Sequence, residues 1–258
     1  MKIMIVGCGF VGSTIANSLE EQFFDVARVD PKYYKDTICD HCDSDGIIVC
    51  VDTPTINGKC DDTNLKSVMM EIGSTCHAKG GLMHLPVLIK STITPDLLEM
   101  YPDNVTYSPE FLREKTAKED FKNQEHMILG GNPKYTTFWK EVFSYLDTEY
   151  LETDRQTASI VKYMYNNWLA MKVAFFHEIF QKIGNEYDHD SLVDIISKFE
   201  NIGPSHMNVP NQHRTLGFDG HCFPKDMVAF MNYSKSDILK SVFSINSILN
   251  EFNGEKND

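Results

Sequence analysis

Apolar and polar residues alternate along the first half of the chain in a way that predicts strands and helices in turn. Short apolar runs predict strands at residues 2–6, 25–30, 46–53, 85–92, 104–110 and 126–131. Helical patterns lie between these runs, at 63–78, at 133–145 and in a helix that begins near Val11. Strands that alternate with helices indicate an α/β fold with helices on both faces of a parallel sheet. Ligands then bind at the carboxyl ends of the strands.

The pattern changes after about Thr153, where the strand signal ends. Residues 154–184 contain no proline and carry apolar side chains at helical spacing, with Gly184 as a C-cap. A helix of that length would measure about 45 Å, which is longer than a small domain is wide. We therefore expect it to connect two domains, 1–152 and 153–258, and to present part of its aromatic surface to a second copy in a homodimer.

The second half of the chain is predicted to be helical. Further helices are expected at 189–199, 225–234 and 237–252, with a long loop at 200–224. Long loops in compact domains are often functional. The expected fold is an N-terminal Rossmann-like, doubly wound parallel sheet, followed by a long connecting helix and a small all-helical domain.

Composition and charge narrow the range of functions. The 258 residues are 42% hydrophobic and 24% charged, which is typical of a soluble globular protein. A net charge of −13 would repel phosphate backbones, so nucleic acid is an unfavourable partner. Gly7 interrupts the first apolar run, which is too short for a signal peptide or a membrane span. Seven cysteines, an odd number, favour reduced thiols over a disulfide framework. We therefore expect a cytoplasmic protein, and the short apolar run predicts no membrane contact.

The sequence GCGFVG at residues 7–12 predicts a dinucleotide site at the end of the first strand. Gly7 permits a tight turn, Gly9 lets the backbone approach a pyrophosphate, and Gly12 allows the helix to pack closely on the strand. Asp30 ends the second predicted strand, where a carboxylate accepts hydrogen bonds from an adenosine ribose and repels a 2′-phosphate. NAD is therefore the expected cofactor, although basic residues nearby keep NADP as an alternative. The simpler explanation is a turn followed by a solvent-facing aspartate.

Several other polar residues have simpler explanations when each is taken singly. Thr55 and Thr92 follow predicted strands, where cap or turn roles are more common than ligand binding. Glu110 and Glu114 would share one helical face if their segment is helical, where Arg113 beside them would make a solvated ion pair.

Two more features contain groups that could take part in catalysis. Lys162 and Asn166 lie one turn apart in the long predicted helix and could stabilise an oxyanion, although a surface lysine is the usual case. The sequence GFDGHCFPKD at residues 217–226 ends at a helix start, where helix N–H groups and the cation of Lys225 would favour the thiolate of Cys222. A small buried cysteine is the simpler alternative.

Two sequences that look like metal sites do not meet the spacing that such sites need. CDHC at 39–42 lacks a second ligand pair at zinc spacing. HEIFQ at 177–181 has Gln181 where a zinc protease needs its second histidine. The sequence therefore predicts no metal site.

Taken together, six fragments resemble the UDP-glucose/GDP-mannose dehydrogenase family and occur in that family's order. They are GCGFVG, VDTPT, IKSTITP, YSPEFLRE, IVKYMYNNWLAMKVAFFHEI and GFDGHCFPKD. The resemblance implies oxidation of a nucleotide-sugar primary alcohol to a carboxylate, in two NAD-dependent steps through a cysteine thioester. It further implies a role in polysaccharide biosynthesis, with UDP-glucose as the expected substrate.

The resemblance also assigns roles to individual residues. The catalytic residues it implies are Cys222 as nucleophile, Lys162 and Asn166 as oxyanion donors, Asp226 and Thr92 for proton transfer, and Glu110 for thioester hydrolysis. The NAD contacts it implies are Gly7, Gly9, Phe10, Val11, Gly12, Asp30, Lys35, Thr53, Thr55, Thr92, Glu114 and Lys225. The substrate contacts it implies are Glu110, Phe111, Leu112, Arg113, Lys162, Asn166, Gly217, Phe218 and Asp219.

The chain departs from the family pattern at positions that bear on substrate binding. Members usually carry a third, C-terminal domain that binds the nucleotide, and this chain stops after the central helices. Asp219 replaces a glycine that lies against the sugar. Asn201 stands near the place of an arginine that reaches a neighbouring subunit's site, and Arg214 could substitute for it. Oxidation of a smaller sugar or hydroxyacid therefore stays an alternative, as does a degenerate NAD-binding protein without turnover.

Overall fold

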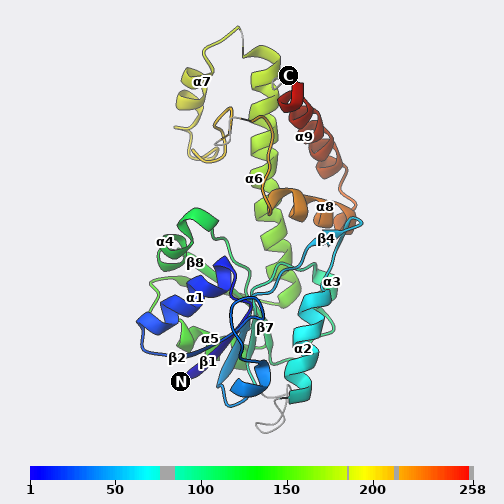
Figure 1. The fold of residues 1–258 in the computed structure, drawn as a ribbon. Helices are drawn as coiled ribbons and strands as arrows, with labels where there is room; N and C mark the ends of the chain where they lie inside the picture. The colour runs from blue at the N-terminus through cyan, green and yellow to red at the C-terminus, as the bar shows by residue number, and fades with distance from the viewer. Residues whose placement is uncertain (76–84, 185, 212–214, 256–258) are drawn as a thin grey trace. The chain divides into compact units, whose positions relative to one another are not determined.

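The computed structural model describes residues 1–75, 85–184, 186–211 and 215–255 (Figure 1). The described residues fold into two compact units. Unit 1 comprises Met1–Pro54 and Cys60–Lys162, and unit 2 comprises Thr55–Lys59 and Tyr163–Asp258. Arg214 and the end of the helix predicted at 63–78 lie outside the described residues.

Unit 1 is built around one sheet with the strand order β2-β1-β3-β6-β7-β8-β9. The strands are β1 (Lys2–Val6), β2 (Asp25–Val29), β3 (Gly46–Val49), β6 (Val87–Ile89), β7 (Val105–Tyr107), β8 (His126–Gly130) and β9 (Glu149–Thr153). β8 pairs antiparallel to β7, whereas the other neighbouring strands of the described sheet run parallel. The predicted α/β class with a parallel sheet is confirmed, and the antiparallel pairing of β8 with β7 is a feature that the sequence pattern did not predict.

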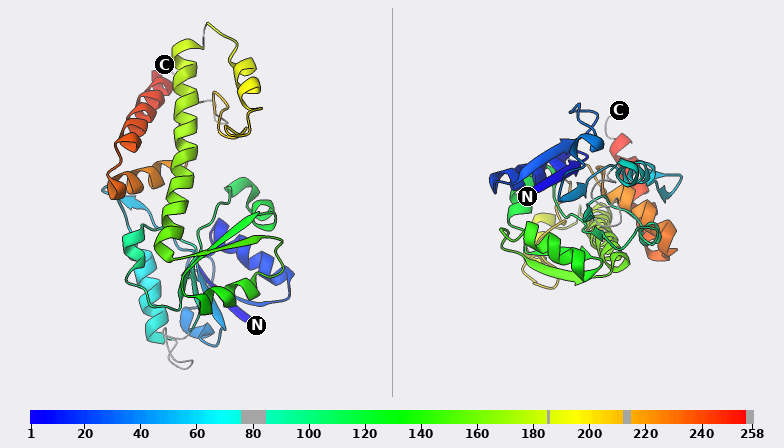
Figure 2. Two further views of the ribbon diagram at one scale, coloured as in Figure 1. Left: turned by 180° about the vertical axis from the view of Figure 1, so that it is seen from behind. Right: turned by 90° about the horizontal axis from the view of Figure 1, so that it is seen from below.

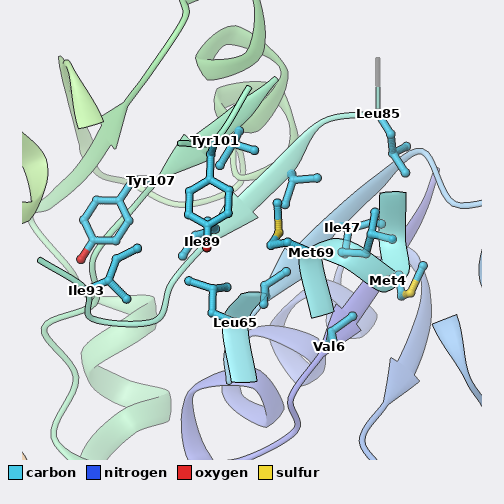
Figure 3. Packing of buried hydrophobic residues seen from close by; sticks show 14 of the residues in the cluster. Met4, Val6, Ile47, Leu65, Met69, Leu85, Ile89, Ile93, Tyr101 and Tyr107 are labelled. Carbon is cyan, nitrogen blue, oxygen red and sulfur yellow. The ribbon is translucent and has the colours of Figure 1, made fainter. Parts of the chain in front are cut away.

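Both faces of the sheet are covered, as the apolar runs predict. The helices of unit 1 are α1 (Phe10–Glu21), α2 (Thr63–Thr75), α3 (Pro95–Leu98), α4 (Ala117–Lys122) and α5 (Pro133–Val142). Ile3 and Ile5 of β1 pack with residues of α1 and α5 on one face of the sheet. Met4 and Val6 pack with residues of α2 on the other face (Figure 3). Figure 2 shows the ribbon from two further sides. Alternate side chains of a strand point to opposite faces, so one short apolar run supplies both cores.

The strand order creates a switch point next to β1. The chain passes from β1 to β2 on one side and then to β3 on the other side of β1. In open α/β sheets, ligands bind beyond the carboxyl ends of the strands at such a point. The turn that follows β1 is therefore well placed to bind a ligand.

Unit 2 contains most of one long helix, three shorter helices and most of a small hairpin among its described residues. The helices are α6 (Arg155–Ile183), α7 (His189–Ile196), α8 (Phe223–Ser234) and α9 (Asp237–Glu255), and the hairpin strands are β4 (Thr55–Ile56) and β5 (Lys59–Cys60). The 29 residues of α6 confirm the predicted long helix, which begins in unit 1 and continues in unit 2. The hairpin is an element that the sequence pattern did not predict.

Candidate active site

The glycine turn after β1 lies at the switch point of the sheet. Gly7 has a φ of 88°, and a Cβ there would lie 2.6 Å from the carbonyl oxygen of Cys50, which follows β3. A Cβ on Gly12 would lie 1.9 Å from the carbonyl oxygen of Gly7, whereas nothing lies within 4 Å of a Cβ on Gly9. The fold itself therefore needs glycine at positions 7 and 12, and Gly9 leaves open space where the backbone of α1 begins.

Asp30 is held beside this turn by two backbone amides. The Cys8 amide donates to Oδ2 at 2.7 Å, and the Lys32 amide donates to Oδ1 at 2.9 Å. Each carboxylate oxygen has a further lone pair, so Asp30 can still accept hydrogen bonds from ribose hydroxyls. The described residues in the first turn of α1 include no acid that would repel a phosphate.

A surface hollow opens at this turn. It is lined by Cys8, Gly9, Phe10, Ser13, Tyr33 and Tyr34. A glycine turn without a side chain at its tip, a helix N-terminus and a carboxylate held for a ribose make up the donor and acceptor set that a dinucleotide requires. The residues of unit 1 thus fit NAD.

Other predicted NAD contacts of unit 1 take varied positions. Thr53 is buried, and its hydroxyl donates to the carbonyl oxygen of Thr92 at 2.6 Å. This bond links the segment that follows β3 to the segment that follows β6, at the carboxyl ends of the strands. Lys35 and Glu114 are exposed. Their predicted cofactor contacts stay predictions.

A buried ion pair links the start of α6 to the segment after β7. Lys162 Nζ donates to the carbonyl oxygen of Glu110 and lies 3.7 Å from its Oε1. The same ammonium lies 5.0 Å from the ring centre of Phe111, and Glu110 Oε2 accepts from the Leu112 amide at 2.6 Å. The side chains of Lys162 and Glu110 are only 5% and 11% exposed. A cation fixed in this way can stabilise a developing negative oxygen.

Lys90, a second buried lysine, lies near this pair and is not among the predicted site residues. Its Nζ donates to Ser108 Oγ at 3.1 Å and to the carbonyl oxygen of Pro109 at 3.4 Å. Burial lowers the pKa of Lys90 to about 8, even though Cys50 and Glu110 favour its charged form. A lysine inside the apolar run at 85–92 was the sequence signal that could have identified it.

The segment from Ser108 to Arg113 is not helical, so Glu110 and Glu114 do not share a helical face. Glu110 instead turns back onto its own backbone, as described above. Arg113 Nη2 donates to Asp120 Oδ1 at 2.6 Å. This bond is the largest cause that holds the pKa of Asp120 down at about 2. The substrate role expected of Arg113 stays a prediction.

Asp226 is the centre of a polar network in unit 2. The residue is 1% exposed, Oδ2 accepts from Asn166 Nδ2 at 2.6 Å, and Oδ1 pairs with Lys225 Nζ at 2.6 Å. The Thr55 hydroxyl donates to the carbonyl oxygen of Lys225 at 2.9 Å. The Asp226 amide donates to the carbonyl oxygen of Cys222 at 2.9 Å. The structure thus brings together five predicted site residues from three separate stretches of sequence.

Cys222 is exposed and occupies the N-cap position of α8. The loop that leads to it begins with Gly217 and Phe218, which are buried, and continues through Asp219, which is exposed. The side chain of Phe218 packs in the hydrophobic core of unit 2 together with Met227. Phe218 therefore has a packing role, whereas the exposed Asp219 is accessible to solvent.

The predicted site residues divide between the units. The glycine turn, Thr92, Glu110 and Lys162 belong to unit 1, and Asn166, Asp226 and Cys222 belong to unit 2. Within the described ranges, no group of three or more His, Cys, Asp or Glu side chains is placed to hold a metal ion. Nor does any described helix combine the length and hydropathy needed to cross a bilayer.

Two domain models of one family match most of the chain. The NAD binding domain of the UDP-glucose/GDP-mannose dehydrogenase family matches residues 32–147, and the central domain of that family matches residues 156–252. The chain belongs to the UDP-glucose/GDP-mannose dehydrogenase family. The match to the family's NAD binding domain confirms the prediction of NAD as the cofactor.

Relatives of this family member include longer proteins. An uncharacterized protein of Methanocaldococcus jannaschii is 28% identical over 99% of this chain and 34% of its own length. A UDP-glucose 6-dehydrogenase of Rickettsia felis is 31% identical over 62% of this chain and 39% of its own length. The chain therefore spans between about a third and two fifths of the length of these curated relatives.

Solved structures of the family share the fold of this chain. A UDP-glucose dehydrogenase of Pyrobaculum islandicum superimposes with a TM-score of 0.83 at 23% identity, over 96% of this chain and 68% of that one. A UDP-D-ManNAc dehydrogenase of Pyrococcus horikoshii gives a TM-score of 0.82 at 18% identity, over 98% of this chain and 69% of that one. At such low identities the likeness concerns the fold alone.

Proposed function

We propose that this family member uses NAD to oxidise the primary alcohol of a nucleotide sugar to a carboxylate, with UDP-glucose as substrate and UDP-glucuronate as product. The observation that carries the proposal is the place of Cys222, an exposed thiol at the start of α8, next to the network of Asp226, Asn166 and Lys225. Relatives named UDP-glucose 6-dehydrogenase support the choice of sugar.

The proposed reaction has two oxidations separated by a covalent step. Bound NAD supplies the chemistry of a hydride acceptor in each oxidation. Loss of a hydride and the hydroxyl proton converts the alcohol to an aldehyde, and the Cys222 thiol adds to its carbon to give a thiohemiacetal. Loss of a second hydride and the new hydroxyl proton gives a thioester. Water then cleaves the carbon–sulfur bond, which releases the acid and restores the thiol, so each acid accounts for two NADH.

We assign the charged groups to this reaction as follows. Lys162 and Asn166 stabilise the oxyanion, since Lys162 is a buried cation and the Asn166 amide has a second N–H besides the one donated to Asp226. Asp226 and Thr92 transfer protons, and Glu110 assists the water that hydrolyses the thioester. Of these groups, Cys222, Asn166 and Asp226 belong to unit 2, whereas Lys162, Thr92 and Glu110 belong to unit 1.

A homodimer formed through α6 is part of the proposal. Exposed apolar side chains on α6 are Val161, Met164, Trp168, Phe175, Ile179 and Ile183. Their spacings of three, four and seven residues place them along one stripe of the helix, as in helices that pair with a partner. We expect light scattering at micromolar concentration to give the mass of a dimer, and Trp168→Glu to weaken it. A monomeric mass for the wild-type protein would refute this assembly.

We also propose bounds for the two domains and a cellular location for the protein. Residues 1–152 form the NAD-binding domain, and residues 153–258 form the helical domain with the catalytic loop. A cytoplasmic location, favoured by the odd number of cysteines, would let the product supply polysaccharide biosynthesis.

An NADH-production screen with UDP-glucose, UDP-N-acetylmannosamine and GDP-mannose tests the proposal, with the acid product quantified in parallel. We expect the highest rate with UDP-glucose. NADH formation with a simple hydroxyacid but with no nucleotide sugar would favour a one-step oxidation, for which a thiol is not needed. Calorimetric binding of NAD without any turnover would instead indicate a binding protein.

A further inference from the structure

The loop that carries Cys222 has a buried foot and an exposed arch. Gly217 and Phe218 form the foot and are buried, whereas residues 219–222 form the arch and are exposed. The arch ends where α8 begins, and there the Asp226 amide holds the carbonyl oxygen of Cys222 at 2.9 Å. Because the arch is short, the place of Cys222 within unit 2 depends on how the foot is held.

His177 of α6 holds one side of the foot. Its ring is 1% exposed, its Nδ1 accepts from the Gly217 amide at 2.8 Å, and its Nε2 lies 2.9 Å from the carbonyl oxygen of Asn208. An amide N–H can only donate and a carbonyl oxygen can only accept, so Nδ1 is bare and Nε2 carries the proton. The two partners therefore fix a neutral ring in one tautomer. Burial lowers the pKa of His177 and so favours the same neutral state.

Asn246 of α9 holds the other side of the foot. Its Oδ1 accepts from the Phe218 amide at 2.7 Å, and its Nδ2 donates to the carbonyl oxygen of Phe218 at 3.1 Å. Gly217 has a φ of 83°, and a Cβ there would lie 2.6 Å from Asn246 Oδ1 and 2.8 Å from Asn250 Oδ1. Glycine at this position thus lets α9 approach the loop closely.

We propose that His177 is a positioning residue, which fixes the foot of the loop through the Gly217 amide and thereby sets the place of Cys222 at the start of α8. The inference rests on the proposed function, in which Cys222 is the nucleophile. It gives the histidine of HEIFQ a role other than metal binding. His177 acts through the backbone of the loop and does not touch the reacting atoms.

Two substitutions separate the hydrogen bonds of His177. His177→Asn places an amide oxygen close to the position of Nδ1 and keeps an acceptor for Gly217, whereas His177→Gln places an amide N–H close to Nε2 and keeps the donor for Asn208. We expect His177→Gln to slow alkylation of Cys222 by iodoacetamide and to lower kcat by about tenfold, with KM for NAD unchanged. His177→Asn should stay within about twofold of the wild type in both measurements. Peptide mass spectrometry identifies the alkylated cysteine.

Lys172→Met is the matched control for loss of a buried polar anchor on the same helix. Lys172 Nζ donates to the carbonyl oxygens of Ile202 and Gly203 at 2.9 and 3.1 Å, which are not part of the foot. This variant should lose thermal stability while Cys222 keeps its alkylation rate. Equal alkylation rates in His177→Asn, His177→Gln and the wild type would overturn the proposal. Equal slowing in both variants would overturn it too, because it would indicate ring packing rather than the Gly217 bond.

Hydrogen exchange of the wild-type protein tests the same point without a substitution. The Gly217 and Phe218 amides should exchange at least about a hundredfold more slowly than the amides of Asp219 and Gly220. Equal exchange rates would contradict a fixed foot even if the variants did not fold. Neither exchange nor alkylation requires turnover, so a failure of the proposed function would be distinguishable from a failure of this inference.

Discussion

Cys8 and Cys222 have similar backbone settings and opposite surroundings. Each lies at the beginning of a helix and close after a glycine with positive φ, which is 88° at Gly7 and 81° at Gly220. Cys8 is 5% exposed, and burial raises the pKa of its thiol to about 11, with a further contribution from the charge of Asp30. Cys222 is exposed and starts a helix whose first turn carries Lys225.

The difference shows that a glycine turn before a helix does not by itself activate a thiol. At Cys8 the turn offers backbone amides to an anionic ligand, and the side chain is withdrawn into the core. A nearby cation is not sufficient either. Burial raises the pKa of Cys50 to about 12, although the charge of Lys90 acts in the opposite direction. Cys222 differs from both of these thiols in its exposure, because Cys8 is buried and Cys50 is partly buried.

The largest expected effect separates the two thiols by activity. Cys222→Ser should lower acid formation by at least about a thousandfold, because a hydroxyl is a much weaker nucleophile than a thiolate. Cys8→Ala, which removes a thiol that points toward the Ile5 carbonyl, should lower it by less than about threefold. Acid yield is measured by chromatography of the sugar nucleotides. Normal yield from Cys222→Ser would remove the nucleophile role.

The second prediction compares glycines within the turn at Cys8. Gly12→Ala should destabilise the protein by more than about 3 kcal/mol, because its Cβ would meet the Gly7 backbone. Gly9→Ala meets open space and should change stability by less than about 0.5 kcal/mol, yet weaken NAD binding by about tenfold. Urea unfolding and calorimetry measure the two quantities. If Gly9→Ala binds NAD as tightly as the wild type, the cofactor does not approach this turn.

The third prediction concerns Lys90, the cation beside the inert thiol of Cys50. Its pKa is about 8 in the folded protein and about 10.5 in the unfolded chain, so the unfolded chain binds more protons between these values. Stability contributed by Lys90 therefore rises with pH through this window and is lost as the pH falls through 8. Relative to Lys90→Met, the wild type should gain about 2 kcal/mol between pH 7.5 and 9.5.

Urea unfolding of wild type and Lys90→Met at each pH measures this difference and cancels the titration of groups common to both. Parallel pH profiles would show that the pKa of Lys90 is the same in the folded protein as in the unfolded chain, and would contradict the prediction.

The smallest expected effect concerns the aspartates near the two thiols. Asp30 accepts the Cys8 amide and fits a ribose, whereas Asp219 is exposed three residues before Cys222. An exposed carboxylate repels an anionic substrate, so Asp219→Gly should lower KM for UDP-glucose by about threefold and leave kcat unchanged. Steady-state kinetics at low ionic strength measure this change. An unchanged KM would place Asp219 away from the substrate, and a raised KM would show that the carboxylate contributes to binding, so either result would contradict the expected repulsion.

Much of unit 1 could be predicted from the sequence because its strands are buried on both faces and therefore apolar. β9 was missed because its residues are mostly exposed and EYLET has no apolar run. The segment after Ser108 was open to a helical interpretation because Glu110 and Glu114 have helical spacing. In the structure, Lys90 and Lys162 hold the backbone carbonyls of Pro109 and Glu110, which no local pattern reveals.

The site in unit 2 likewise depends on long-range contacts that no local sequence pattern reveals. The GFDGHCFPKD loop by itself left a small buried cysteine as the simpler interpretation, and the family resemblance assigned the roles of Cys222 and Asp226. His177 and Asn246, which hold the foot of that loop, lie 40 and 28 residues away from their partners. Contacts of this kind depend on how helices pack, and a single sequence contains no periodic or spacing signal for them.

The ratio of NADH formed to acid released by the wild-type protein, with UDP-glucose as substrate, tests the proposed chemistry most directly. Two hydride transfers through a Cys222 thioester require two NADH for each UDP-glucuronate. We expect that ratio from the wild type and no acid from Cys222→Ser. A ratio of one, with an aldehyde or ketone as the final product, would contradict covalent capture at Cys222.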